Sequence, residues 1–388
     1  MIKKKFLLVL LTFFMIFALV ACGSDKDRDD DYDRKSRTEK NYDEDDDDET
    51  GKEPVIIPGE EDIKIDDKVQ QEIENGTSKM TGYRNIALFG VDAQNREQIF
   101  KNSRSQCIMI VSINMDTGDV KLVSVHCDTY LNIGSDSYQK CNAAYAKGGA
   151  EQAVKMLNNN LDLNITDFVT ISYELLIDLI DNLGGIYIDV DEEELEYIND
   201  YQIDIVAAWK YGVNVTPSTT DEELSVVQDT DYVKMTEPGY RLLNGLQAAA
   251  YCRIRQTKGG VYKYAERHRE VLKAIDEQAK KMSVVELNKI FNKVCDSLYT
   301  NLSTEDIFAL IEKIADYQIV DQNEFPQADL RVAGSCGAKG QCIVPRDLVK
   351  NVAWLHEFLF EEENFEVSES VKEYSEKIKS DTDSYFDN

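Results

Sequence analysis

The stretch from Tyr83 to Tyr130 constrains the fold of this chain more than any other part of it. It opens with an apolar run, Ile86–Val91, and after a polar loop it continues into a second apolar stretch that turns at residues 116–119. Short apolar runs bounded by turn residues are typical of buried strands, and a Thr-Gly turn between two such runs indicates a hairpin. We therefore predict three strands in this region.

Polar residues lie at one end of each predicted strand. Asp92 follows the first run, Arg104 begins the cluster Arg-Ser-Gln-Cys before the second, and Cys127-Asp128 follow the third. Sheet proteins place functional groups at strand ends, where loops bring side chains from several strands together. These strand ends are therefore the candidate functional site.

Strands and helices alternate in the next part of the chain. Helices are predicted for residues 150–161 and 173–183, and strands for residues 168–172 and 186–190. Gly184-Gly185 fits the glycine that commonly ends a helix. The alternation predicts an α/β sandwich rather than an all-β fold.

The second half of the chain carries weaker signals. Residues 191–235 are acidic and mixed in pattern, and we expect them to form a peripheral insertion. Residues 251–255 are predicted to form a strand that presents Arg253 and Arg255 on one face. Further helices are predicted at residues 266–282, 288–299, 304–316 and 344–360, and the acidic tail beyond Glu361 is predicted to be loose.

The N-terminus has the pattern of a secretory signal. Lys3-Lys4-Lys5 precede an apolar stretch at residues 6–20, which is short for a membrane span of about 20 residues. The ending Leu-Val-Ala-Cys resembles a bacterial lipobox, whose cysteine, here Cys22, receives a lipid. An uncleaved signal anchor is the alternative. Both predict an extracytoplasmic protein tethered to the outer face of the bacterial cytoplasmic membrane.

Charge and composition narrow the class of protein. The formal net charge of −30 argues against a nucleic-acid partner, because phosphate backbones bind basic faces. Residues 23–58 are charged and of low complexity, so we expect a disordered tether. Its acidic run at residues 45–48 lacks the Gly and Glu of an EF-hand loop, which makes a calcium site the weaker interpretation.

Seven cysteines remain besides Cys22. Thiols can pair outside the membrane, and Cys336 and Cys342 bracket a Gly-rich loop, so they are the candidates for a disulfide. Cys107 and Cys127 lie near opposite ends of the predicted hairpin and are either a cross-strand disulfide or separate buried thiols. The chain contains no CxxC pair, so it has no zinc-site spacing.

Five motifs occur in one order between residues 85 and 282. They are Leu88–Asp92, Arg104–Cys107, Val125–Thr129, Lys140–Tyr145 and Leu243–Arg255. In this order they resemble the LytR-CpsA-Psr (LCP) family of bacterial cell-envelope proteins. The last motif, Leu-Asn-Gly-x-Gln-Ala-x-x-Tyr-x-Arg-x-Arg, is intact.

The resemblance implies a three-layer α/β/α sandwich with a central mixed sheet that encloses a polyprenyl chain, and a small helical C-terminal region. Members of the family transfer glycopolymers from undecaprenyl-phosphate carriers to peptidoglycan, and Mg²⁺ assists at the pyrophosphate. Such chemistry develops charge on phosphate oxygens, which cations and guanidinium groups stabilise. The resemblance implies catalytic roles for Asp92, Arg104, Gln106 and Asp128, pyrophosphate binding by Lys140, Arg253, Arg255 and Arg267, and a Mg²⁺ ligand at Asp92.

Several charged positions of the family pattern are neutral in this chain. Gln106 replaces the second magnesium carboxylate, Cys127 replaces the arginine of the corner, and Val261–Tyr264 replace Asp-x-Gly-Arg. Loss of a single donor from an anion-stabilising site costs about 2.7–4 kcal/mol of the activation free energy. We therefore expect a weakened Mg²⁺ site and reduced turnover. Two compensations stay open: Gln106 can ligate a metal ion through its carbonyl oxygen, and Lys263 can replace a lost cation.

The sequence divides the chain into five segments and leaves two functions open. The segments are a lipoprotein signal peptide (1–22), an acidic tether (23–80), an LCP domain (81–282, with the insertion 191–235), a helical C-terminal extension (283–362) and an acidic tail (363–388). The first function is a membrane-anchored phosphotransferase that moves a polyprenyl-(pyro)phosphate-linked glycopolymer onto peptidoglycan. The alternative is a catalytically degraded module that binds polyprenyl phosphate or regulates the envelope. Retained Arg253 and Arg255 argue against a scaffold with neither role, because buried arginines without an anion are costly.

Overall fold

The computed structural model describes residues 65–93, 103–213, 218–279, 281–294, 298–303 and 317–386, with isolated positions 63, 99, 215, 216 and 306. The predicted signal peptide, the lipidation site Cys22, the acidic run 45–48, Cys295 and nearly all of the predicted helix 304–316 lie outside the described residues. No helix within the described ranges is long and apolar enough to cross a membrane.

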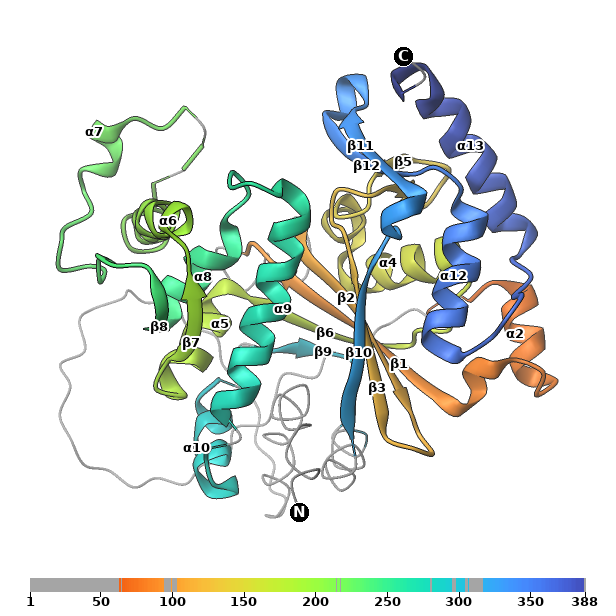
Figure 1. Cartoon of the computed structure of the whole chain (residues 1–388), viewed down its shortest axis with the longest axis horizontal. Coiled ribbons are helices and arrows are strands. Elements are labelled where there is room, and N and C mark those ends of the chain that lie inside the picture. The colour runs from red at the N-terminus through yellow and green to blue at the C-terminus, as the bar shows by residue number, and fades with distance from the viewer. Residues whose placement is uncertain are drawn as a thin grey trace, which may run out of the picture.

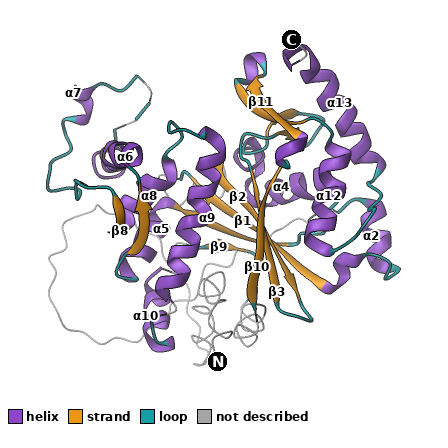
Figure 2. Ribbon diagram, viewed as in Figure 1, coloured by secondary structure: helices purple, strands orange, loops and turns teal. Residues whose placement is uncertain are grey.

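A mixed sheet forms the centre of the molecule (Figures 1 and 2). Six strands of the described chain lie in the order β10-β3-β2-β1-β6-β9. The pairs β1–β2, β2–β3 and β6–β9 are antiparallel, whereas β1–β6 and β3–β10 are parallel. The strands are β1 (Tyr83–Val91), β2 (Ser105–Asn114), β3 (Asp119–Val125), β6 (Asp167–Ser172), β9 (Tyr299–Thr300) and β10 (Gln318–Phe325). The strand–loop–hairpin prediction for residues 83–130 is confirmed.

Helices cover both faces of the sheet, as Figure 1 shows. Side chains of β1 alternate between two cores: Ile86 and Leu88 belong to one apolar cluster, and Ala87 and Phe89 to the other. This alternation follows from the two-residue repeat of a strand that is buried on both faces. The predicted three-layer α/β/α sandwich is therefore confirmed.

The first layer of helices includes the segment expected to be a peripheral insertion. Its helices are α5 (Tyr173–Asn182), α6 (Glu192–Tyr211), α8 (Gly245–Arg253), α9 (Gly260–Ala279) and α10 (Val284–Val294). A capping box between Asp191 and Glu194 starts α6, which packs against α8. The short helix α7 (Asp221–Leu224) and the two-stranded sheet of β7 (Ile186–Val190) and β8 (Gly239–Leu243) lie beside this layer.

The second layer contains α2 (Asp67–Glu74), α4 (Ala143–Leu161), α12 (Leu348–Phe360) and α13 (Glu369–Phe386). The small sheet of β4 (Tyr130–Asn132) and β5 (Tyr138–Lys140) leads into α4, which is kinked at Gly148 and Gly149. The hairpin of β11 (Arg331–Ser335) and β12 (Gln341–Pro345) precedes α12.

The C-terminal region differs from the prediction in two ways. It is not purely helical, because β9 and β10 join the central sheet and β11 and β12 form a hairpin. The tail is also not loose: α13 buries Val371, Ile378 and Thr382 against the second layer. Charged residues separate these buried positions, so the helical repeat is hard to recognise in the sequence.

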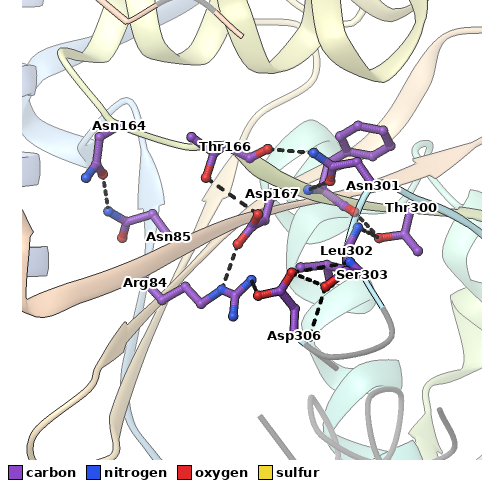
Figure 3. Close-up of polar contacts among 11 residues, drawn as sticks. Arg84, Asn85, Asn164, Thr166, Asp167, Thr300, Asn301, Leu302, Ser303 and Asp306 are labelled. Carbon is purple, nitrogen blue, oxygen red and sulfur yellow. Dashed lines mark hydrogen bonds and ion pairs between the residues drawn. The ribbon is translucent and has the colours of Figure 1, made fainter. Parts of the chain in front are cut away.

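A polar network closes the end of the sheet at which β1 begins (Figure 3). Arg84 binds Asp167 of β6 at 2.7 Å and Asp306 at 3.0 Å. Asn301 donates to the Thr166 carbonyl oxygen at 2.7 Å, which ties the segment after β9 to the start of β6. The predicted site residues lie at the opposite end of β1, where Asp92 follows the strand.

Candidate functional site

The register of the sheet brings the three predicted strand ends together. Val91 pairs with Ser105, so Asp92 and Arg104 lie on adjacent strands at one end of the sheet. Met109 pairs with Ser124, which places Gln106 opposite the Cys127-Asp128 corner at the same end. The prediction that these residues gather at one end of the sheet is confirmed.

A polar pocket with a cavity volume of about 300 Å³, called here the mouth, opens at this end of the sheet. Its lining consists of charged, amide and tyrosine side chains. They are Asp92, Arg104, Gln106, Asp128, Lys140, Asn142, Tyr173, Tyr201, Arg253, Arg255 and Tyr264. Seven of the eight residues predicted to act on phosphate therefore line one pocket, and Arg267 is the exception.

Helix α8 delivers two arginines to the mouth. The Asn244 side chain accepts from the Gln247 backbone N–H and the Gln247 side chain caps Asn244 in return, so the helix begins at Gly245. A Cβ at Gly245 would lie 2.2 Å from the Ile177 carbonyl oxygen, so only glycine allows α8 to approach α5 this closely. The motif Leu-Asn-Gly-x-Gln-Ala thus specifies a helix start and a helix contact.

The predicted strand at residues 251–255 is wrong. Helix α8 continues through Arg253, and the chain becomes extended at Ile254. The capping box and the run of three alanines, residues 248–250, favour helix strongly enough to include Tyr251 and Cys252. Arg253 is the last helical residue and Arg255 follows the end of the helix, which is why both still reach the mouth.

Asp128 is held by two cations. Lys140 Nζ lies 3.0 Å from its Oδ1, and Arg255 Nη1 lies 2.8 Å from its Oδ2. The carboxylate is buried, at 7% exposure. Both oxygens therefore serve to orient Lys140 and Arg255 at the wall of the mouth.

Arg255 makes further contacts with the two residues that depart from the family pattern. Its Nη2 donates to Gln106 Oε1 at 2.8 Å and to Cys127 Sγ at 3.2 Å, and its guanidinium stacks on the Tyr264 ring at 3.9 Å. Burial lowers the pKa of Arg255, but Tyr264, Cys127 and Asp128 more than offset this and raise it above its usual value. Arg255 is therefore a fixed cation with a restricted orientation.

Arg253 is the more loosely paired of the two arginines at the end of α8. Its Nη1 lies 4.0 Å from Asp92 Oδ1, and its guanidinium lies 5.7 Å from the Tyr173 ring and 5.6 Å from the Tyr201 ring. Asp92 is the more exposed carboxylate of the mouth, with 39% of its side chain accessible. The Arg253–Asp92 contact is loose enough to open for a bound anion.

Arg267 does not line the mouth, which corrects its predicted role in pyrophosphate binding. It is fully buried in α9, and its Nε and Nη2 each lie 2.9 Å from Glu194 Oε1 of α6. The guanidinium also donates to the Ile254 carbonyl oxygen at 3.0 Å and to Thr257 Oγ1. Arg267 therefore anchors the segment that follows α8 and positions Arg253 and Arg255 indirectly.

An apolar pocket with a cavity volume of about 70 Å³ adjoins the mouth between β1, β2 and the first helical layer. Its lining is almost wholly aliphatic and aromatic: Leu88, Phe89, Gly90, Val91, Cys107, Met109, Ile171, Ser172, Tyr173, Leu176, Cys252, His268, Val271 and Leu272. Burial lowers the pKa of His268 to about 4, so its ring is neutral at pH 7. Tyr173 lines both pockets, so the apolar pocket and the mouth share a wall.

The thiols of the described chain are free. Cys336 and Cys342 do not form the predicted disulfide, although their side chains hydrogen-bond within the β11–β12 hairpin. Cys107 and Cys127 are also separate thiols, as the second of the two interpretations had it. Burial raises the pKa of Cys107 to about 12 and that of Cys127 above its usual value, so both are neutral.

The mouth offers a Mg²⁺ ion one loosely held carboxylate, Asp92, because two cations of the protein hold the other, Asp128. Mg²⁺ in proteins is usually held by one or two carboxylates together with substrate phosphates. Both Asp128 oxygens bind cations, the Gln106 oxygen accepts from Arg255, and Asp92 faces Arg253. No group of three or more His, Cys, Asp or Glu side chains suited to a metal ion occurs in the described part of the chain.

The sequence did not reveal the aromatic part of the mouth. Tyr173, Tyr201 and Tyr264 come from three different helices, and no spacing in the sequence connects them. The Glu194–Arg267 pair was missed for the same reason, because its partners lie on α6 and α9.

Comparison with known proteins identifies the family. The model of the LytR_cpsA_psr family matches residues 46–341. The polyisoprenyl-teichoic acid–peptidoglycan teichoic acid transferase TagV of Bacillus subtilis is 28% identical over 217 residues, which are 54% of this chain and 48% of TagV. The chain thus spans about half the length of this relative. The transferase TagT of the same organism is 24% identical over 251 residues, covering 64% of this chain and 69% of TagT.

Solved structures share the fold. A crystal structure of a Streptococcus agalactiae protein superimposes with a TM-score of 0.56 at 24% identity, covering 77% of this chain and 94% of that one. The crystal structure of B. subtilis TagV gives a TM-score of 0.51 at 22% identity, covering 71% of this chain and 97% of that one. Because the family model covers well over half of the sequence, the chain belongs to the LytR-CpsA-Psr family.

Proposed function

We propose that the chain is a cell-envelope phosphotransferase that takes a glycopolymer from a polyprenyl-(pyro)phosphate carrier and attaches it to peptidoglycan. The observation that carries this proposal is the adjacency of two unlike pockets. An apolar pocket shares Tyr173 with a mouth that contains Arg104, Lys140 and Arg253. A molecule with a long apolar tail and an anionic head satisfies both pockets at once. The names of TagV and TagT describe the same kind of transfer.

The proposed reaction exchanges one phosphorus–oxygen bond for another. A hydroxyl of peptidoglycan attacks the phosphorus that carries the glycopolymer, and the bond from this phosphorus to the bridging oxygen of the pyrophosphate breaks. Polyprenyl monophosphate leaves with the bridging oxygen, and the glycopolymer becomes linked to peptidoglycan through a phosphodiester. Asp92, the exposed carboxylate of the mouth, is the candidate acceptor for the hydroxyl proton.

The cationic residues have separate parts in this reaction. Arg253 and Arg104 bind the phosphate oxygens, on which negative charge increases as the bond breaks. Lys140 and Arg255, fixed by Asp128, add positive potential from the wall of the mouth. The tail in the apolar pocket keeps the phosphorus in place relative to Asp92.

The location of the protein is part of the proposal. The basic residues Lys3 to Lys5, the apolar stretch after them and Cys22 support a lipoprotein on the outer face of the cytoplasmic membrane. Peptidoglycan and polyprenyl-linked polymers are both accessible on that face. Globomycin, which blocks lipoprotein signal cleavage, should cause an uncleaved form to accumulate, and Cys22→Ser should remove the lipid from the protein.

A second function, binding without transfer, is favoured by the contacts of Gln106 and Cys127. Both take a hydrogen bond from Arg255, so this arginine is less free to follow the changing charge of a reacting phosphate. A protein of this kind would hold a polyprenyl-phosphate lipid in order to escort or sense it.

A transfer assay separates the two functions. The full chain is incubated with a radiolabelled saccharide on polyprenyl pyrophosphate and with purified peptidoglycan, and label on peptidoglycan and release of polyprenyl monophosphate are both measured. The matched variant is Asp92→Asn, which keeps the size of the side chain and removes its basicity.

Each outcome of this assay has one meaning. Transfer by the native chain, with a loss of at least about 100-fold in Asp92→Asn at unchanged lipid binding, supports the phosphotransferase. Lipid binding without transfer by the native chain supports the binding module. Failure of the native chain to bind the lipid contradicts both functions.

A further inference from the structure

The two carboxylates of the mouth face cations of the protein itself. Asp128 has Lys140 on one oxygen at 3.0 Å and Arg255 on the other at 2.8 Å. Asp92 has Arg253 at 4.0 Å. A divalent cation at Asp128 would have to displace a lysine or an arginine from a buried carboxylate, which would leave that cation of the protein without its partner.

Residue 106 is neutral where the family pattern has a further carboxylate in the mouth. The Gln106 carbonyl oxygen accepts a hydrogen bond from Arg255 Nη2 at 2.8 Å, and an amide oxygen carries no net charge. A cation that used this oxygen would lie beside the Arg255 guanidinium and be repelled by it. The amide also keeps its NH₂ group, which can donate to an anion but cannot bind a metal ion.

Glutamine at position 106 also makes the net charge of the mouth more positive. Four cations, Arg104, Lys140, Arg253 and Arg255, face the two carboxylates, so the net charge of the lining is +2. An aspartate at position 106 would lower this charge to +1. Glutamine at position 106 therefore gives the mouth additional positive charge from the chain itself, at the point where the family pattern has a carboxylate for Mg²⁺.

We propose that this mouth binds the phosphate head of its lipid directly, through guanidinium and ammonium groups, and independently of any divalent cation. The inference rests on the proposed function in that it takes a polyprenyl-phosphate lipid as the ligand. Arg253 and Arg104 bind the phosphate oxygens, Lys140 and Arg255 supply fixed positive charge, and Asp92 turns from Arg253 when the anion enters. Residue 106 determines whether binding requires a metal ion.

Lipid affinity with and without magnesium tests this inference. The probe is a fluorescent polyprenyl pyrophosphate, titrated with the full chain once in excess EDTA and once in saturating Mg²⁺. Because the proposed contacts are all made by the protein, we expect the two dissociation constants of the native chain to differ by less than about twofold.

Two variants of nearly equal size sharpen the test. Gln106→Asp adds a carboxylate to the lining that contains Asp92, and Gln106→Asn is its neutral counterpart of the same length. We expect Gln106→Asp to lose about tenfold or more in affinity in EDTA, because a third carboxylate in the mouth repels the phosphate, and to recover it in Mg²⁺. Gln106→Asn should bind equally in both buffers.

Direct metal binding gives a second measurement that does not involve the lipid. Free Mn²⁺, followed by electron paramagnetic resonance during titration with protein, should be depleted by Gln106→Asp and not by the native chain or by Gln106→Asn. Specific depletion of Mn²⁺ by the native chain, abolished by Asp92→Asn, would overturn the inference.

The failures of the inference and of the proposed function are distinguishable. Lipid binding by the native chain that is lost in EDTA and restored by Mg²⁺ overturns the inference and leaves the proposed function standing. Absence of lipid binding in both buffers overturns the proposed function and the inference together. Equal binding in both buffers supports the inference, whether or not transfer to peptidoglycan is observed.

Discussion

Two arginines of the same sequence region, Arg253 and Arg267, have opposite environments. Arg267 is fully buried between α6 and α9 and is bonded to a carboxylate, a carbonyl oxygen and a hydroxyl. Arg253 lines the mouth, and its carboxylate neighbour is 4.0 Å away. A buried cation whose donors are used within the protein holds the fold together, whereas a cation with a loose partner can take a ligand.

The comparison teaches that the partner of an arginine, more than its place in a motif, determines its function. Both residues were assigned to pyrophosphate from the sequence alone. The difference arises from Glu194, which lies far from both in the sequence and pairs only with Arg267. Variants of the two arginines should therefore separate folding from ligand binding.

The largest effect is expected for Arg267→Ala, on stability. Removing one partner of a buried ion pair leaves the other charge, on Glu194, buried and unpaired. We expect the free energy of unfolding to fall by about 3–5 kcal/mol. Urea denaturation followed by circular dichroism measures this change.

An exposed ion pair provides the matched control for that variant. Arg241 and Glu237 form an i,i+4 pair with side chains that are 46% and 70% exposed. Arg241→Ala should lower the free energy of unfolding by at most about 1 kcal/mol, because solvent screens exposed ion pairs. Equal losses for Arg241→Ala and Arg267→Ala would contradict the difference between buried and exposed arginines.

The next largest effect is expected for Arg253→Ala, on ligand affinity. Hydrogen bonds to charged groups contribute about 1.5–3 kcal/mol, so affinity for a polyprenyl pyrophosphate should fall by about 10- to 100-fold. The midpoint of urea unfolding should stay unchanged. Isothermal titration calorimetry measures the affinity, and Arg241→Ala again serves as the control. If Arg253→Ala unfolds at a lower urea concentration than the native chain but binds the lipid with native affinity, Arg253 stabilises the fold and does not bind the ligand.

The smallest of the three effects concerns a third arginine, Arg331, whose environment is between the two extremes. It bonds Glu324 at 2.7 Å beside His126, with 9% of its side chain exposed. Burial raises the pKa of Glu324, but hydrogen bonds and charges from His126 and Arg331 outweigh burial and lower the pKa to about 2.

A depressed pKa makes this stabilisation depend on pH. It is fully present above the ordinary glutamate pKa of 4.5 and is lost as the pH falls towards 2. The free energy of unfolding of the native chain should exceed that of Glu324→Gln by about 1–2 kcal/mol at pH 6, and this difference should shrink below pH 4.5. Urea unfolding at several pH values tests this, with Glu357→Gln, on the exposed side of α12, as the control. A difference that is constant with pH would exclude the proposed role of the Glu324 carboxylate.

Most of the fold could be predicted because the relevant signals are local. The apolar run of β1 and the turn before β3 define three strands, and their register then places Asp92 near Arg104 and Gln106 near Asp128. Residues 251–253, which end α8, were predicted as a strand, since Arg-x-Arg fits an exposed strand as well as a helix terminus. The Asn244–Gln247 capping box and the three alanines that follow it favour the helix.

The rest of the site depends on distant contacts that a single sequence does not show. Tyr173, Tyr201 and Tyr264 converge on the mouth only after the helices have packed. The acidic tail was misjudged for a related reason. Its many charges are typical of a loose, solvated segment, but Val371 and Ile378 are spaced so that one face of α13 is apolar.

The close packing of α8 on α5 makes Gly245 a point of mutational vulnerability for the whole mouth. A single methyl group there would meet the Ile177 carbonyl oxygen at 2.2 Å and force the two helices apart. Arg253 is the last residue of α8 and Arg255 follows two residues later, so both guanidinium groups would move with the helix. The alignment of the phosphate-binding groups with the lipid pocket therefore depends on a position that has no side chain and lines neither pocket.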